Sequence, residues 1–207
     1  PISVGKGCNS MDTQTRIFFV DDDRVVRTCL RHFLKKFEDF QLVGEAEDGS
    51  SAIESILDLT PSVALVDIGL PRINGIEVTR KVKMQLPNCK ILMLTSSDDA
   101  RDIFASLDAG ADGYVLKGDL AANLEVAIRS VRVGSVWLDP GIARIVLDAS
   151  NQRQSQGNVS QSGMLSTDEA ELLGSIAGSS CQDGVCLVDP AFLRRLKRLS
   201  QTDSKRS

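Results

Sequence analysis

The sequence is short of the residues that most often carry metal and nucleophilic chemistry. Its 207 residues include one histidine, His32, and an odd number of cysteines, five. A single histidine cannot build a zinc site, and nothing places a nucleophile beside it, so zinc chemistry and Ser–His–Asp catalysis are not expected. An odd cysteine count without a paired framework is typical of a reducing compartment.

Long apolar runs are also absent. The longest uninterrupted ones have four residues, such as Ile17–Val20 and Ile91–Leu94, whereas a membrane-spanning helix needs about 20. No apolar segment typical of a secretion signal opens the chain. We therefore expect a soluble, cytoplasmic protein with no membrane partner. Its hydrophobic content of 42% is that of an ordinary globular protein.

The charge is modest but unevenly distributed. The net charge is −4 and the pI about 5.1, which argues against a chain that binds nucleic acid nonspecifically along its whole length. Residues 187–207 nevertheless hold six Lys or Arg against two Asp, so this tail is at +4 and the preceding residues are at −8.

Short apolar runs alternate with amphipathic stretches from Arg16 onward. The runs occupy residues 16–20, 41–46, 62–66, 90–95 and 112–116. Between them, apolar residues recur at helical spacing; the first such stripe contains Val26, Cys29, Leu30, Phe33, Leu34 and Phe37. Five strands alternating with five helices predict an α/β fold with a parallel, doubly wound sheet that is buried on both faces.

Composition divides the rest of the chain. Residues 1–13 lack periodicity and are expected to be a disordered arm or a cloning remnant, before an α/β domain at 14–135. A linker helix is predicted at 136–149. Ser, Gln, Asn and Gly dominate residues 150–164, which predicts a flexible polar linker. A small helical region is expected at 165–207.

Polar residues stand where four of the predicted strands end. Asp21 and Asp22 follow the first strand, Asp67 the third, Thr95 ends the fourth and Lys117 follows the fifth. The carboxyl ends of parallel strands converge on one edge of the sheet. Three carboxylates there suit a hard divalent cation, and Mg²⁺ is the predicted ion. With the lysine and the hydroxyl, they predict phosphoryl transfer onto an aspartate.

Four segments resemble the receiver domain of two-component response regulators. They are VDDD at 20–23, ALVDIGLPRINGIEV at 64–78, ILMLTSS at 91–97 and GADGYVLKG at 110–118. The resemblance covers roughly residues 14–135. It implies the flavodoxin-like strand order 2-1-3-4-5 and a role in a phosphorelay. It also implies a histidine kinase as phosphodonor and, as a further expectation, homodimerisation on phosphorylation.

The same resemblance assigns the site residues. It implies that Asp67 is the phosphoacceptor and that Lys117 pairs with the bound phosphate. It further implies that Mg²⁺ is held by Asp21, Asp22 and Asp67 with the backbone carbonyl of Gly69. The chain is thus expected to catalyse its own aspartyl phosphorylation and dephosphorylation and no other reaction.

Two more residues have roles in the switch by resemblance. Thr95 is the hydroxyl that moves toward the phosphate, and Tyr114 is the aromatic side chain whose rotamer follows it. The surface around the fourth helix, the fifth strand and the fifth helix is then expected to change its affinity for a partner. Gly75, in the loop after the phosphoacceptor, is predicted to need a positive φ.

The C-terminal region begins like a known output module. LSTDEAELL at 165–173 resembles the opening of a LuxR-type helix-turn-helix, so the whole chain is similar to a NarL/LuxR-type response regulator. The resemblance stops after Ala177, and the 43 residues from Leu165 are too few for a complete module. A truncated or degenerate output region is therefore expected.

A basic amphipathic helix is predicted near the C-terminus, with three interpretations left open. Its charged positions are Arg194, Arg195, Lys197 and Arg198. The helix packs its apolar stripe on the preceding helix, or binds a partner protein, or contacts the phosphate backbone of nucleic acid in a salt-dependent way. The output is accordingly either transcription regulation or a protein–protein interaction.

Two other classes of protein are weighed as alternatives. One is a DNA-binding transcription factor acting through the atypical C-terminal helices. The other is a stand-alone phosphatase with an aspartyl nucleophile; that class needs a second acid two residues on, where this sequence has Gly69.

Cys181 and Cys186 are close enough in sequence to face each other across a turn, but reduced thiols are the favoured interpretation.

Overall fold

The computed structural model describes residues 14–96, 99–145 and 187–188. The N-terminal arm, the polar linker and nearly all of the output region lie outside these described residues. So do Cys181, Cys186, Arg194, Arg195, Lys197 and Arg198. Within the described residues, none of the helices has both the length and the apolar character needed to cross a membrane.

Strands and helices alternate along the described chain, as the sequence predicts. The strands are β1 Thr15–Val20, β2 Phe40–Ala46, β3 Val63–Asp67, β4 Lys90–Thr95, β5 Gly113–Leu116, β6 Val136–Leu138 and β7 Leu187–Val188. The helices are α1 Arg24–Leu34, α2 Gly49–Leu59, α3 Gly75–Gln85, α4 Ala100–Ala109 and α5 Leu120–Arg132, with a 3-10 turn, η1, at Lys117–Asp119.

One twisted sheet forms the centre of the fold. Its strand order is β2-β1-β3-β4-β5-β6-β7, and β1 to β6 pair in parallel. The predicted order 2-1-3-4-5 is therefore confirmed. Parallel pairing with helical crossovers explains why β1, β3 and β4 read as nearly continuous apolar runs, since both sheet faces are covered.

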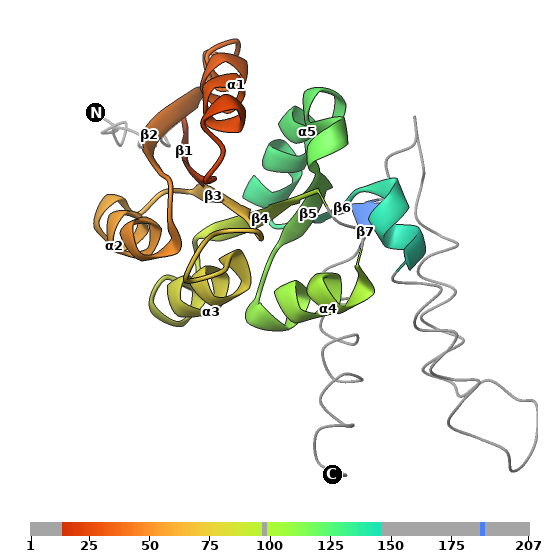
Figure 1. Ribbon diagram of the computed structural model, residues 1–207. Coiled ribbons are helices and arrows are strands. Elements are labelled where there is room, and N and C mark those ends of the chain that lie inside the picture. Colours follow the sequence, from red (N-terminus) through yellow and green to blue (C-terminus); the bar gives the residue numbers. More distant parts are fainter. Residues whose placement is uncertain (1–13, 97–98, 146–186, 189–207) are drawn as a thin grey trace, which may run out of the picture.

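Two helical layers cover the sheet (Figure 1). On one face, α1 and α5 bury alternate strand residues such as Phe19 and Leu65. On the other, α2, α3 and α4 cover the intervening residues, among them Phe18 and Val66. Cys29, which the predicted apolar stripe of the first helix included, is exposed.

The sheet is larger than the five strands predicted. β6 pairs in parallel with β5, and β7 adds to β6 in antiparallel orientation. The prediction of a linker helix from residue 136 is wrong for 136–138, because α5 ends in a Schellman-type turn at Gly134 (φ +89°) that directs the chain back along β5. A three-residue strand buried on both faces is too short to show a period.

A helix does follow, at residues 140–145. Asp139 precedes it and is almost fully buried; its Oδ1 accepts a hydrogen bond from Gly141 N (3.2 Å), and its Oδ2 accepts one from Asn123 Nδ2 (2.9 Å). The backbone N–H of Asp139 donates to Tyr114 O at 3.1 Å. The segment after α5 is therefore fixed to β5 and α5 and belongs to the same fold unit.

Candidate functional site

The polar residues predicted at strand ends meet at the carboxyl edge of the sheet. Asp21 and Asp22 follow β1, Asp67 ends β3, Thr95 ends β4 and Lys117 follows β5. The central strands β1, β3 and β4 are neighbours, and β5 lies next to β4. The topology thus brings together residues that are far apart in the sequence.

Three carboxylates form the core of the site. One oxygen each from Asp21, Asp22 and Asp67 lies within 4.8 Å of the others. Asp21 is fully buried and Asp67 is 4% exposed, while Asp22 faces solvent. Buried carboxylates are costly unless positive charge compensates them, and a set of three carboxylates could hold a hard divalent cation such as Mg²⁺.

Lys117 supplies positive charge to the two buried carboxylates. Its Nζ lies 2.8 Å from Asp21 Oδ2 and 3.1 Å from Asp67 Oδ2. Burial raises the pKa of Asp67, the Lys117 charge offsets part of this rise, and the nearby Asp21 adds to it. Burial alone would lower the pKa of Lys117, but the hydrogen bond to Asp21 and the charges of both carboxylates outweigh it and raise that pKa.

The acidic loop after β1 is held by its own hydrogen bonds. Asp21 Oδ1 accepts from Asp23 N at 3.0 Å, and Asp23 caps α1 by accepting from Val25 N at 2.7 Å. The backbone N–H of Asp21 donates to Ala46 O of β2 at 3.2 Å. The third aspartate of the VDDD motif is therefore a helix cap, and the first two are left to line the edge.

Gly75 is required here for a different reason from the one predicted. The positive-φ glycines of the described chain are Gly110 and Gly134, so the expectation of a positive φ at Gly75 is wrong. Gly75 is the first residue of α3, and a Cβ there would lie only 2.0 Å from Asp67 O. Close approach of two backbone segments excludes any side chain at this position.

Thr95 and Tyr114 lie next to the carboxylate site. Both are buried, Thr95 at 3% exposure and Tyr114 at 0%. Burial raises the pKa of Tyr114, and the Thr95 side chain beside the phenol partly offsets this. The Tyr114 ring belongs to the core formed with Ile103 of α4 and Leu138 of β6, so this aromatic side chain points inward in the structure.

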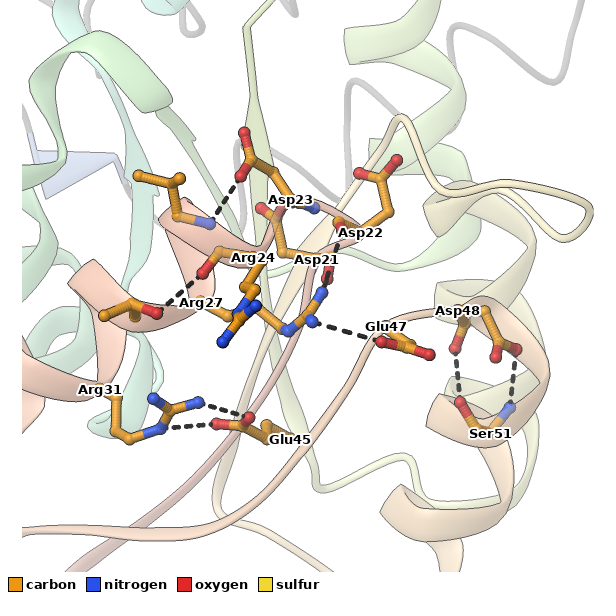
Figure 2. Close-up of polar contacts among 12 residues, drawn as sticks. Asp21, Asp22, Asp23, Arg24, Arg27, Arg31, Glu45, Glu47, Asp48 and Ser51 are labelled. Atoms are coloured by element: carbon orange, nitrogen blue, oxygen red, sulfur yellow. Dashed lines mark hydrogen bonds and ion pairs between the residues drawn. The ribbon is translucent and has the colours of Figure 1, made fainter.

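Arg27 is part of the site and was not predicted from the sequence. Figure 2 shows its guanidinium at the base of the acidic loop, where Nη1 donates to Asp21 O (2.8 Å) and to Asp22 O (3.0 Å). Its Nη2 pairs with Glu47 Oε2 at 3.3 Å. A side chain that donates to backbone carbonyls leaves no signal in the sequence, because every residue type carries such a carbonyl. The one available signal was an arginine one helical turn after the Asp23 cap.

Comparison with known proteins identifies the class. Residues 17–129 match the family model described as the response regulator receiver domain. The chain belongs to this family.

Relatives and solved structures agree with this assignment. The chain is 31% identical over 162 residues to the response regulator protein VraR of Staphylococcus epidermidis, which covers 78% of this chain and 75% of that protein. VraR of Staphylococcus aureus is 32% identical over the same coverage. A LuxR-family two-component response regulator from Aurantimonas has a TM-score of 0.64 at 30% identity, covering 67% of this chain and 99% of that one.

A further comparison concerns a receiver with a phosphate mimic. The isolated REC domain of RcsB from Salmonella enterica serovar Typhimurium, in the presence of phosphomimetic BeF₃⁻, has a TM-score of 0.59 at 25% identity. It covers 64% of this chain and 98% of that chain. The described part of this chain is thus a response regulator receiver of NarL/LuxR type.

Proposed function

We propose that this protein is a phosphorylation-controlled switch that accepts a phosphoryl group on Asp67. The observation that carries the proposal is the Lys117 ammonium, which contacts Asp67 and Asp21 at 3.1 and 2.8 Å within a cluster of three carboxylates. The match to the receiver family and the likeness to the RcsB receiver in the presence of a phosphate mimic support it. The phosphodonor is a histidine kinase or a small acyl phosphate.

Mg²⁺ is the proposed cofactor. Asp21, Asp22 and Asp67 would hold it together with the Gly69 carbonyl, because all four offer the oxygen ligands that this ion prefers. When bound, the ion neutralises the carboxylates and the negative charge of the incoming phosphoryl group.

The chain's own residues then perform the transfer. An Asp67 oxygen forms a bond to phosphorus as the donor's P–N bond breaks, and the donor imidazole leaves with that electron pair. Lys117 moves its ion pair from the Asp67 carboxylate to the phosphoryl oxygens, which stabilises charge in the transition state. Asp67 must be ionised to attack, and its burial, which raises its pKa, opposes ionisation until positive charge compensates it.

The same site is proposed to hydrolyse its own phosphoaspartate. A Cβ at Gly69 would lie 3.6 Å from Asp67 Oδ2, so glycine leaves open space beside the carboxylate where water can enter. A larger residue at this position is therefore expected to lengthen the phosphorylated lifetime.

The switch is proposed to run from Thr95 through Tyr114 into β6. Thr95 lies beside the Tyr114 phenol, and Tyr114 shares one core with Leu138 and Ile142. A shift of Thr95 toward phosphate would remove its contact with Tyr114 and so alter the packing of residues 136–145. In the cytoplasm the resulting output is transcription regulation or partner binding, with homodimerisation as one form. A DNA-binding role of the C-terminal basic residues remains the second candidate, tested by salt-dependent gel shifts.

Phosphorylation is directly measurable. Incubation with acetyl phosphate and Mg²⁺ is expected to add one phosphoryl group by intact mass, which hydroxylamine removes and EDTA prevents. Asp67→Asn is expected to abolish the addition, and Asp58→Asn, an exposed aspartate on α2, is the matched control. Labelling that persists in Asp67→Asn would show that the assignment of the phosphoacceptor is wrong.

A further inference from the structure

We propose that Arg27 is a positioning residue for the metal site, which it serves by fixing the backbone that presents Asp21 and Asp22. The inference rests on the proposed function, because it concerns the Mg²⁺ that phosphorylation requires. Arg27 itself lies on α1, and its contacts are with backbone carbonyls of the loop, so it acts through other residues.

The two carbonyls that Arg27 holds flank a single residue. Asp21 O and Asp22 O belong to the peptide groups on either side of the Asp22 Cα, and both accept from the same nitrogen, Nη1, at 2.8 and 3.0 Å. The Arg27 side chain is only 13% exposed. A largely buried guanidinium that donates to both peptide groups restricts the φ and ψ of Asp22, the exposed member of the three carboxylates.

Glu47 holds the other terminal nitrogen of the Arg27 guanidinium. Its Oε2 lies 3.3 Å from Arg27 Nη2, and it follows β2 directly. Since Asp21 N also donates to Ala46 O at the end of β2, the loop is tied to the same place by two routes. The Glu47 carboxylate also offsets the guanidinium charge that would otherwise repel a cation at the site.

The sign of the effect separates positioning from simple charge. If Arg27 acted mainly through its charge, its removal would strengthen Mg²⁺ binding, because a cation near the site would be lost. If it acts by orienting the loop, its removal weakens binding, and loss of such outer-shell partners typically costs about 10–100-fold in metal affinity. The geometry, with three bonds that each constrain direction, points to the second outcome.

The chain contains a matched control one helical turn away. Arg31 also lies on α1 and also pairs with a carboxylate of β2, Glu45, at 2.6 and 3.1 Å. In the described structure, the hydrogen bonds of its guanidinium all go to Glu45. Arg31→Gln thus removes a comparable ion pair from the same α1–β2 seam without touching the acidic loop (Figure 2).

The test is a Mg²⁺ titration of the full chain, in which the chemical shifts of backbone amides in ¹H–¹⁵N spectra report binding. We expect Arg27→Gln to raise the dissociation constant at least tenfold, Arg27→Lys to raise it less, and Arg31→Gln to leave it within about twofold of the wild-type value. In phosphorylation assays, Arg27→Gln is expected to need more Mg²⁺ for half-maximal rate yet to approach the wild-type rate at saturation. Thermal unfolding in EDTA monitors the fold, and Arg27→Lys keeps the test valid if the Gln variant unfolds.

The outcomes are distinguishable. Unchanged or tighter Mg²⁺ binding by Arg27→Gln overturns the inference while leaving the proposed function intact. An equal loss in Arg31→Gln also overturns it, because the effect would then belong to the seam as a whole. A wild-type chain that binds no Mg²⁺ overturns the metal site of the proposed function, and the positioning role with it.

Discussion

Replacing Gly75 by alanine tests the close approach that shapes the phosphoacceptor loop. Helix propensity alone predicts that Ala at the start of α3 gains up to about 1 kcal/mol over Gly. The structure predicts the opposite sign. A Cβ at this position would lie 2.0 Å from Asp67 O and 2.8 Å from Asp67 C, both of them backbone atoms that no rotamer change can move.

The size of the effect follows from that distance. Carbon and oxygen atoms in contact normally stay about 3.3 Å apart or more, so the two segments must separate by more than 1 Å. Overpacking of this kind costs about 1–3 kcal/mol and occasionally more. We expect Gly75→Ala to lower the free energy of unfolding by at least about 2 kcal/mol, and to displace Asp67 so that phosphorylation slows.

Urea denaturation followed by circular dichroism measures this directly. With a slope of about 1–3 kcal/mol per molar urea, the midpoint is expected to fall by roughly 1 M. Gly118→Ala is the matched control: a Cβ there would meet nothing within 4 Å, so its stability is expected to stay equal or rise by up to about 1 kcal/mol. Wild-type stability in Gly75→Ala would refute the steric reasoning.

Further predictions concern three other buried groups. Burial raises the pKa of Asp67, which means that the fold favours the protonated side chain. The contribution of this group to the free energy of unfolding is therefore fully present below the pKa of the unfolded state, about 3.9, and is lost as pH rises through the folded-state pKa. In EDTA, Asp67→Asn should therefore be more stable than wild type near neutral pH but not near pH 4, and a less stable variant at neutral pH would contradict this. Asp139→Ala is expected to cost about 1–2 kcal/mol in urea unfolding, because a helix cap is lost and the Asn123 amide loses its partner; an unchanged midpoint would argue against it. Burial raises the pKa of the Cys89 thiol to about 11, so iodoacetamide should label the exposed Cys29 faster than Cys89 in peptide maps. Equal labelling of the two would show that Cys89 is accessible.

Much of the fold could be predicted because buried parallel strands leave a strong signal. The runs at 16–20 and 90–95 correspond to β1 and β4 within one residue. Convergence of strand ends follows from topology alone, so the order of strands along the chain is enough to place Asp21, Asp67 and Lys117 at one edge of the sheet. Their assigned roles in phosphoryl transfer and metal binding stay predictions.

What could not be predicted depends on contacts that residue type does not encode. Arg27 acts on backbone carbonyls, which every residue carries. Gly75 was expected to need a positive φ, whereas the requirement comes from Asp67 O, which is close in space and eight residues away in sequence. β6 has only three residues, and its pairing with β5 follows from the turn at Gly134. The hydrophobic pattern of three residues cannot show which strand they pair with.

The position of β6 changes how the signal is expected to leave the receiver. β5 would be the edge of a five-stranded sheet, with its backbone free for a partner, but here Tyr114 pairs with Leu138 and its carbonyl accepts from Asp139 N. Ile142, at the start of the following helix, shares the Tyr114 core. Interiors are close-packed, so we expect a change of the Tyr114 rotamer to disturb the packing of the core that it shares with Leu138 and Ile142. If Tyr114 follows the switch as proposed, residues 136–145 are therefore expected to respond before any partner that docks on the surface.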